Sequence, residues 1–197
     1  RDVGVPTFNL DLIYGAAGES MVDWQDTVAG ALALDPPHVS AYGLTVEAGT
    51  PLAAQPDRHP DDDDQADKYE FVDEQLIAAG LANYEVSNWA VPGHESRHNF
   101  LYWRQQNYRG FGCAAHSHAD GRRWWNIRTP DRYIDAVNAG VSVEASSETL
   151  DVNQRRSEGQ QLTLRTRDGV ERSAFDEATL ELVGDMVVEH PTEPERV

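Results

Sequence analysis

The chain has very little cysteine: Cys113 is the single one among 197 residues. One thiol cannot form a disulfide within the chain. Nor can it hold an iron–sulfur cluster by itself, because such clusters are usually bound by several cysteine thiolates. Two interpretations of Cys113 stay open. It is either a small buried apolar residue, which is the commoner role of a free cysteine, or a nucleophile or soft metal ligand.

Long apolar runs and basic residues are also scarce. No stretch approaches the roughly 18 apolar residues of a membrane-spanning helix, so we expect a soluble, cytoplasmic protein. Lysine and arginine number 16 against 34 acidic residues, which gives a net charge of −18. Because this charge repels phosphate backbones, nucleic acid is not an expected partner. The start shows neither an initiating methionine nor a signal-peptide pattern, which predicts a piece of a longer protein.

The N-terminal part has the pattern of a strand, a helix and a second strand. An apolar run over 9–14 ends at a glycine, and Ser20 can begin a helix in a capping box with Asp23. Two prolines end that helix before a strand predicted over 38–46. This order implies a right-handed parallel crossover and an α/β fold, whose ligands bind at the carboxyl ends of the strands. Three polar residues are expected near that edge: Asp11, Thr45 and Glu47.

The rest of the chain predicts a mixture of elements. A loop rich in proline and aspartate, to about Asp64, precedes a helix over 65–79 and a strand over 82–89. A small-residue loop over 110–117 leads into a hairpin about Asp120-Gly121. Further helices are predicted over 130–139, 153–166 and, on a weaker signal, 177–188.

Residues 98–103, with the sequence HNFLYW, place an imidazole, an amide and two amphipathic rings in one cluster. Neutral imidazole is a common metal ligand, and tyrosine and tryptophan each combine an apolar face with one polar atom. Such a set suits a flat apolar ligand that carries a metal. From these residues alone, a half-buried strand with a satisfied core histidine is the more frequent outcome, so both interpretations stay open.

Three other pairs have a chemical and a structural interpretation. His94 and His98 are four apart, like a zinc pair on a helix, but the preceding Pro-Gly turn makes a regular helix doubtful and no third ligand has motif spacing. Zinc is therefore disfavoured. His116 and His118 would share one face of a strand, as residues of a hairpin often do without any chemical role. The last pair is Trp124 and Trp125. Either both rings form one wall of a ligand site, or one ring lies on the core face and the other on the surface face of the same strand.

Several sequence blocks follow one another in a recognisable order: NLDLIYG at 9–15, HVSAYGL at 38–44, EAGTPL at 47–52, YEVSNWA at 84–90, RHNFLYW at 97–103, HS at 116–117 and RWWN at 123–126. The first blocks resemble the radical-SAM proteins related to oxygen-independent coproporphyrinogen III oxidase. The later blocks narrow the resemblance to the HemW branch, the haem chaperones, whose haem-binding signature is HNxxYW. The resemblance covers about residues 7 to 170, and the joint order of the blocks makes it highly specific.

The resemblance implies a fold and a set of site residues. Residues 1–60 would hold the last strands of an incomplete parallel barrel of the radical-SAM, TIM-like type. Residues 61–150 would form an α+β accessory region with the HNxxYW block, and 151–197 a C-terminal helical segment. The positions that match the family's S-adenosylmethionine pocket are Asp11, Thr45 and His116. The positions on the haem side are His98, a candidate ligand of the haem iron, with Asn99, Tyr102 and Trp103 as the pocket wall.

By the same resemblance, the full-length parent would bind haem and pass it to haem-accepting proteins, with S-adenosylmethionine and a 4Fe–4S cluster as cofactors. The family's CxxxCxxC cluster motif is absent here, so catalysis by this chain alone is not expected. Any membrane association is expected only through partners. The alternatives are an oxygen-independent coproporphyrinogen III oxidase and an inert fragment with an open sheet edge. The chain departs from the family pattern at Ser96, where a cysteine is usual, and at Cys113 and Ala114, where small residues are usual.

Overall fold

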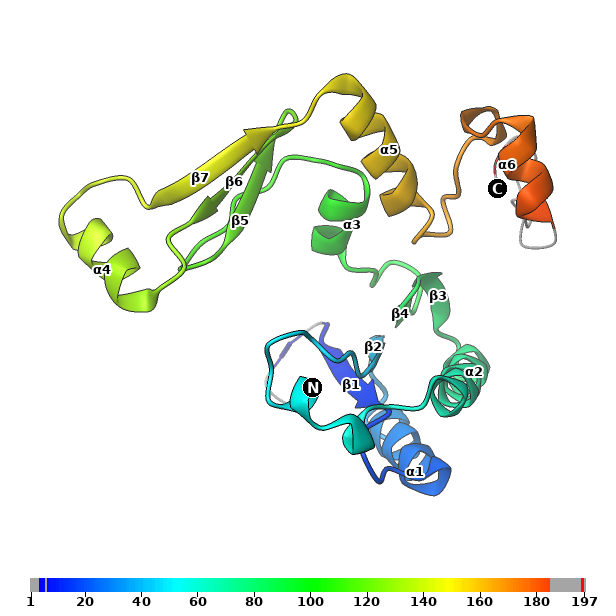
Figure 1. Cartoon of the computed structure of the whole chain (residues 1–197). Helices are drawn as coiled ribbons and strands as arrows, with labels where there is room; N and C mark the ends of the chain where they lie inside the picture. The colour runs from blue at the N-terminus through cyan, green and yellow to red at the C-terminus, as the bar shows by residue number, and fades with distance from the viewer. Residues whose placement is uncertain (1–3, 6, 185–195, 197) are drawn as a thin grey trace. The chain divides into compact units, whose positions relative to one another are not determined.

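The computed structural model describes residues 4–5, 7–184 and 196 (Figure 1). They divide into two compact units, Arg1–Glu95 and Ser96–Val197. Each unit has its own sheet. Among the described residues, no helix combines the length and the apolar character that crossing a bilayer requires.

The division between the units lies between Glu95 and Ser96, whereas the family resemblance implied divisions after residues 60 and 150. Packing explains the difference. Helix α2 (Asp62–Ala78) lies against strands of the first unit, although it follows a long irregular connection. Helix α5 (Val152–Thr163) contacts helix α3 (Arg97–Trp103) in the second unit, so the C-terminal helices are not a separate body there.

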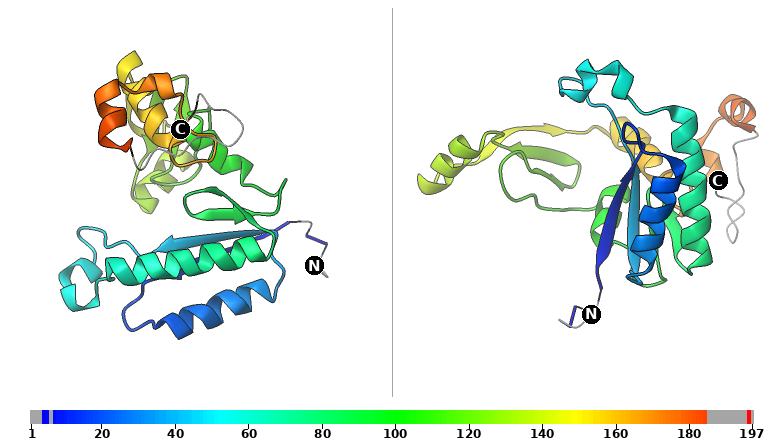
Figure 2. Two further views of the ribbon diagram at one scale, coloured as in Figure 1. Left: turned by 90° about the vertical axis from the view of Figure 1, so that its right-hand side faces the viewer. Right: turned by 90° about the horizontal axis from the view of Figure 1, so that it is seen from below.

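The first unit is a four-stranded sheet with two helices on one of its faces (Figure 2). The strand order is β1-β2-β4-β3, with β1 and β2 parallel and the other two pairs antiparallel. The parallel pair confirms the predicted crossover and the α/β character of this part. Besides α2, its elements are β1 (Asn9–Tyr14), α1 (Met21–Leu32), β2 (His38–Gly43), η1 (Leu52–Ala54), η2 (Pro56–Arg58), β3 (Ala82–Glu85) and β4 (Asn88–Ala90).

The core of the first unit lies between its sheet and its helices. Helix α1 begins as predicted, because the Ser20 side chain accepts from the Asp23 backbone while Asp23 reaches back to the Ser20 backbone. The apolar stripe of α1 and that of α2 then meet the sheet face. Apolar side chains at every second position of the strands and at about every fourth position of the helices point into this core. The buried residues of the core are Tyr14, Trp24, Val28, Val39, Ala41, Val72, Leu76, Leu81 and Trp89.

Two sequence expectations for the first unit were wrong. Helix α2 begins at Asp62 rather than after the acidic run, since Asp61 caps it and the next three aspartates form its first turn, where the helix dipole favours negative charge. Residues 82–89 are not one strand. They form the hairpin β3–β4, which turns at Val86-Ser87, two residues that carry no glycine, asparagine or proline signal for a turn.

The second unit holds a three-stranded antiparallel sheet in the order β5-β6-β7. Helix α4 lies at one end of the sheet and α5 follows the other end (Figure 1). The hairpin β5–β6 turns at Asp120-Gly121, both with positive φ, as the sequence predicts. Besides α3 and α5, the elements are β5 (His116–Ala119), β6 (Arg122–Asn126), α4 (Pro130–Asn138), β7 (Glu144–Thr149), η3 (Arg172–Ala174) and α6 (Glu177–Leu182).

The second unit also departs from the sequence expectations. The HNFLYW block is the helix α3, so the half-buried strand is excluded as its structure. Strand β7 was missed, because its sequence EASSET has no apolar residue except one alanine and every side chain is exposed. Helix α6 confirms part of the helix predicted over 177–188, whose last residues, 185–188, lie outside the described part.

Candidate functional site

Helix α3 presents the HNxxYW side chains of the second unit. The Ser96 side chain caps the helix by accepting from the Asn99 backbone N–H at 3.3 Å. His98 and Tyr102 are one helical turn apart, so they share a face. His98 Nε2 and the Tyr102 hydroxyl are 2.7 Å apart in a hydrogen bond, and their rings meet edge to face. The sequence-predicted histidine is therefore held by another residue of the same block, on an exposed surface.

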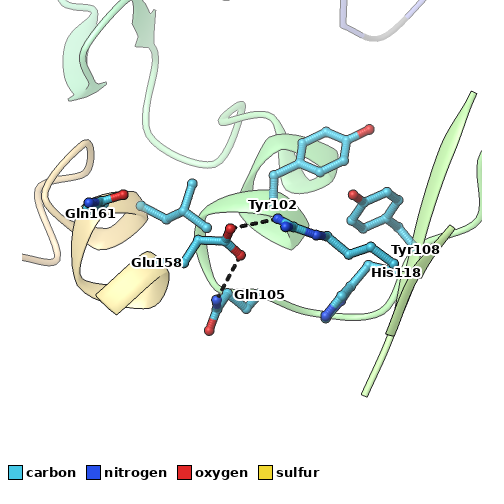
Figure 3. A pocket seen from close by; sticks show the side chains of 8 residues that line it. Tyr102, Gln105, Tyr108, His118, Glu158 and Gln161 are labelled. Atoms are coloured by element: carbon cyan, nitrogen blue, oxygen red, sulfur yellow. Dashed lines mark hydrogen bonds and ion pairs between the residues drawn. The ribbon is translucent and has the colours of Figure 1, made fainter. Parts of the chain in front are cut away.

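A pocket of about 360 Å³ lies beside this helix (Figure 3). The Tyr102 ring meets the Tyr108 ring edge to face, with 4.6 Å between centroids. Burial first, and then Tyr102, raises the pKa of Tyr108, so its hydroxyl stays protonated at neutral pH. Residues from α3, β5, β6, α5 and the chain between them line the pocket: Tyr102, Gln105, Tyr108, His118, Arg123, Glu158, Gln161 and Leu162.

The charged side of this pocket is an ion pair. Arg123 binds Glu158 at 2.6 Å, and Gln105 donates a longer hydrogen bond to Glu158 (Figure 3). Arg123 also binds Glu148, at 2.8 Å. The arginine charge is therefore compensated by two carboxylates before any ligand binds. The pocket offers an aromatic face and a neutralised polar wall, which suits a mainly apolar ligand.

His118 lines the pocket but has a structural role. Its Nδ1–H donates to the Gln106 carbonyl at 3.0 Å, and its Nε2 accepts from the Gly121 backbone at 3.2 Å. Both ring nitrogens are thus in use, and the side chain is buried. His116 differs: it is exposed and stacks on Trp125 with 5.7 Å between ring centroids. Of the two interpretations of this pair, the contacts favour the structural one, because each ring is held by partners of its own.

Trp103, the last residue of α3, has a hydrogen-bond donor without an acceptor in the part of the chain that the structure describes. Its indole Nε1–H is buried and has no hydrogen-bond partner among the described residues. The Arg165 guanidinium lies over the Trp103 ring, 4.7 Å from its centroid. A buried donor without an acceptor costs free energy unless a ligand or water satisfies it. The same helix therefore carries a histidine, a tyrosine and an unsatisfied indole N–H.

In the first unit, polar side chains cover the sheet face opposite the helices. The Tyr84 hydroxyl donates to His38 Nε2 at 2.7 Å, and His38 Nδ1–H donates to Asn9 Oδ1 at 2.6 Å. Asn9 Nδ2 in turn donates to Asp11 at 2.6 Å and to Ser40 at 3.0 Å. Strands of a parallel pair are ordinarily apolar on both faces. Here one face carries a polar network that is buried at His38 and Ser40 and exposed at Asn9 and Asp11, which indicates a face made for a polar ligand.

Burial lowers the pKa of His38, and the carboxylates of Asp11 and Glu95 oppose that shift. The unfolded chain therefore binds a proton more readily than the folded chain, so the stabilisation is complete above about pH 6.5 and is lost as the pH falls further. We expect the melting temperature to drop more between about pH 7.5 and about pH 5.5 in the wild type than in His38→Gln, which cannot titrate. Equal drops in the two proteins would contradict this account.

Two buried acceptors on the first unit have no donor. The Asn88 amide donates to Glu85 Oε1, but Glu85 Oε2 and Asn88 Oδ1 are without a hydrogen-bond partner among the described residues. The two residues are 2% and 3% exposed. Unsatisfied buried acceptors call for a group that brings N–H or O–H donors. Their place in the hairpin β3–β4, next to Ser40 in the sheet register, puts them on the polar face.

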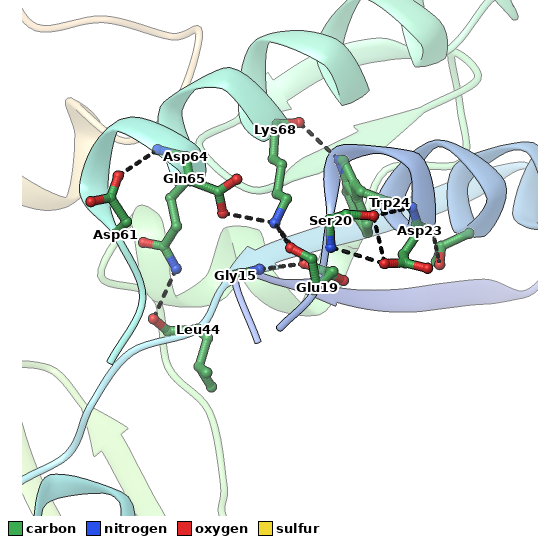
Figure 4. Close-up of polar contacts among 11 residues, drawn as sticks. Gly15, Glu19, Ser20, Asp23, Trp24, Leu44, Asp61, Asp64, Gln65 and Lys68 are labelled. Atoms are coloured by element: carbon green, nitrogen blue, oxygen red, sulfur yellow. Dashed lines mark hydrogen bonds and ion pairs between the residues drawn. The ribbon is translucent and has the colours of Figure 1, made fainter. Parts of the chain in front are cut away.

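A buried lysine organises the carboxyl ends of β1 and β2 (Figure 4). Lys68 Nζ donates to the Glu19 carbonyl at 2.9 Å and to the Asp64 carboxylate at 2.7 Å, while Glu19 accepts from the Gly15 backbone. Gln65 donates to the carbonyl of Leu44, just past β2. The network fixes the chain on both sides of the edge where α/β sheets bind ligands. No local sequence pattern indicates this network.

The structure places the predicted site residues in two groups. Asp11 lies in β1 opposite Ser40, and Thr45 follows β2, both in the first unit and both exposed. His116 belongs to the second unit, as do the residues on the haem side: His98, Asn99, Tyr102 and Trp103. Among the described residues, no group of three or more histidine, cysteine, aspartate or glutamate side chains is arranged to hold a metal ion.

Known proteins show what the chain is similar to. No protein-family model matches it. It is 43% identical over 171 residues to the haem chaperone HemW of Mycobacterium tuberculosis H37Rv, a match that covers 85% of this chain and 44% of that protein. The chain is related to the HemW haem chaperones. HemW of Bacillus subtilis 168 is 33% identical over 181 residues, 90% of this chain and 48% of that protein, and HemW of Escherichia coli K12 is 41% identical over 123 residues, 61% and 32%.

The resemblance to HemW inferred from the sequence blocks is thereby confirmed, while the chain spans less than half of the length of these HemW relatives. A solved structure of coproporphyrinogen III oxidase (HemN) from Escherichia coli, described as a radical SAM enzyme, matches with a TM-score of 0.69 at 17% identity. The match covers 94% of this chain and 46% of that one. This likeness shows a shared mixed α/β fold.

Proposed function

We propose that the protein to which this chain belongs is a haem chaperone, which binds haem and transfers it to haem-accepting proteins. One observation carries the proposal: α3 holds the exposed His98 against Tyr102, and Tyr102 lines an aromatic pocket. The relatives named as haem chaperones support it. We place the protein in the cytoplasm and expect no nucleic-acid partner, in keeping with the net charge of −18.

The residues of this region fit haem as cargo. His98 uses Nε2 for Tyr102, which leaves Nδ1, or Nε2 after a shift of the tyrosine, for the haem iron. The tyrosine rings offer apolar faces, and the unsatisfied Trp103 N–H suits a carboxylate such as those that haem carries. Asn99, partly buried on the same helix, completes the proposed wall. A pocket of about 360 Å³ lies within the usual size range of ligand sites.

We also propose that the first unit is part of an incomplete parallel barrel of the radical-SAM type, with Asp11 and Thr45 on the S-adenosylmethionine side. The family resemblance assigns His116, a residue of the second unit, to the same ligand. The orphaned oxygens of Glu85 and Asn88 fit that ligand, because it brings ammonium, amino and hydroxyl donors. The 4Fe–4S cluster would supply an electron to S-adenosylmethionine. Residues outside this chain must bind that cluster, since Cys113 is the chain's one cysteine.

The alternative is a coproporphyrinogen III oxidase. Its support is the likeness to the HemN structure, which at 17% identity speaks for the fold and not for the reaction. The curated relatives instead carry the chaperone name at 33% and 43% identity. Binding and transfer of haem is therefore the function we propose.

Haem titration of the purified chain, followed by visible absorption, tests this proposal. We expect saturable one-to-one binding, and we expect His98→Ala to weaken it by about tenfold or more, because the variant removes the candidate ligand. His59→Ala is the matched control: His59 is also exposed but lies in the first unit and contacts the Leu52 carbonyl.

Folding of each variant is checked by circular dichroism. Equal affinity and an unchanged haem spectrum in His98→Ala would remove His98 from the site. No binding by the folded wild type would mean that this chain does not hold the haem site. Equal losses in His59→Ala and His98→Ala would indicate unspecific coordination by surface histidines.

A further inference from the structure

A second pocket lies on the other face of the β5–β6–β7 sheet. Neighbouring residues of a strand point to opposite faces, so Arg122 and Trp124 of β6 face away from Arg123 and its pocket. The second pocket has a volume of about 470 Å³. We call it the arginine–valine pocket, and its lining residues are Arg109, Arg122, Trp124, Asn126, Val137, Val141, Ser142, Val143 and Glu144.

One wall of the arginine–valine pocket is cationic. The guanidinium carbons of Arg109 and Arg122 lie 5.5 Å and 5.0 Å from the centroid of the Trp124 ring. Arg122 is also paired with Glu144. Arg109 is exposed and has no carboxylate partner among the described residues. A guanidinium held over an indole without a counter-charge is ready to bind an anion in its planar fork.

The charge along the sequence supports an anionic ligand here. Residues 104–143 contain six arginines against three aspartates, without lysine or glutamate, in a chain whose net charge is −18. Three of these arginines pair with carboxylates outside the stretch: Arg104, Arg122 and Arg123. The lining of the pocket itself holds two arginines and one glutamate, so it carries a net positive charge in a chain that otherwise repels anions.

Another part of the pocket lining is apolar and open. Val137 at the end of α4 and Val141 just after it are 53% and 60% exposed, and Val143 lies further along the same wall. Helix α4, which carries Val137, stands at the end of the sheet (Figure 1). A cavity lined both by valines and by a cation matches a ligand with an anionic head and an apolar body.

We propose that the arginine–valine pocket binds an amphipathic anion: a carboxylate or phosphate head group joined to a short apolar chain. The head group pairs with Arg109, beside the ion pair of Arg122 and Glu144. The chain lies against Val137, Val141 and the Trp124 ring. The site is independent of the proposed haem site, because it occupies the other face of the sheet and shares none of its lining residues.

Isothermal titration calorimetry of the full chain tests the proposal, with decanoate and decyl phosphate as probes below their micelle concentrations. We expect saturable binding of at least one probe, weakened about tenfold by Arg109→Gln through the loss of a charge-assisted hydrogen bond. Val141→Glu is expected to abolish binding, because it places a negative charge on the apolar wall. Arg132→Gln, which changes an exposed arginine of α4 outside the pocket, should bind like the wild type.

Control ligands distinguish binding in the pocket from unspecific binding of charge or of an apolar chain. Uncharged decanol should bind at least tenfold more weakly than decanoate, and acetate should give no heat. Equal binding by Arg109→Gln and Arg132→Gln, or binding of acetate alone, would overturn the proposal. The proposal would also be overturned if the protein sedimented with phosphatidylglycerol vesicles but showed no saturable binding of decanoate or decyl phosphate. That result would indicate a membrane-binding surface rather than a pocket. Haem affinity, measured in parallel, should stay unchanged in Arg109→Gln.

Discussion

Replacing Lys68 with methionine is expected to lower the free energy of unfolding of the first unit by about 3 kcal/mol. Lys68 is the only lysine of the chain, and its side chain is fully buried. It binds the Glu19 carboxylate at 3.2 Å and the Asp64 carboxylate at 2.7 Å. Methionine fills a similar volume but leaves the mostly buried Glu19 carboxylate without its cation, and an uncompensated buried charge is costly.

The estimate stands at the lower end of the range for buried ion pairs because Asp64 is 42% exposed and water can solvate it again. Urea unfolding, followed by tryptophan fluorescence, measures the change. Arg58→Met is the matched control, since it removes one exposed cation from the same unit and should cost less than about 0.5 kcal/mol. A loss as small in Lys68→Met as in the control would show that the network at the strand ends does not stabilise the fold.

The contrast between α1 and Lys68 shows what the sequence could predict. Helix α1 was predictable because its signals are local: the capping box of Ser20 and Asp23, and an apolar residue at each turn. Lys68 gave no such signal. A lysine on an amphipathic helix is ordinarily solvated. The carbonyl that holds it belongs to Glu19, 49 positions away, and no pattern within α2 indicates that distant partner.

The candidate site, too, was predictable only where its residues are close together in the sequence. The residues of the HNxxYW block are close in the sequence, and the four-residue spacing of His98 and Tyr102 is a helical one, although the aromatic composition also suits a strand. The pocket beside them was not predictable, because Glu158 of α5 lies 35 positions from its partner Arg123 on β6. A side chain that enters a site through tertiary packing leaves no periodic signal.

The two units also differ in how they are held together. The buried apolar cluster lies entirely in the first unit, and the buried apolar residues described in the second are Ala136 and Val170. Its other buried residues in the described part are glycine or polar: Gly121, Gly169, Ser117, His118, Asn126 and Thr166. Because burial of apolar area is the main source of stability, the second unit is expected to be the less stable of the two. A haem or anion that binds to it would then stabilise it by mass action.

Trp24→Ala is expected to cost the first unit about 3–5 kcal/mol, which is a large part of the stability of a typical domain. The Trp24 side chain is 0% exposed, its ring lies 5.2 Å from that of Tyr14, and its indole N–H donates to the Lys68 carbonyl at 3.0 Å. Trp24→Phe keeps most of the apolar area and loses the hydrogen bond, so it should cost about 1–2 kcal/mol.

Hydrogen–deuterium exchange, read by mass spectrometry on peptides, separates the units in these variants. Amides of β1, β2, α1 and α2 should exchange much faster in Trp24→Ala than in the wild type, because opening of the first unit becomes more frequent. Amides of β5, β6 and β7 should keep their wild-type exchange rates, because the buried core around Trp24 contains no residue of the second unit. If exchange rises equally in both sheets, the two units unfold as one, and the second unit owes its stability to the core around Trp24.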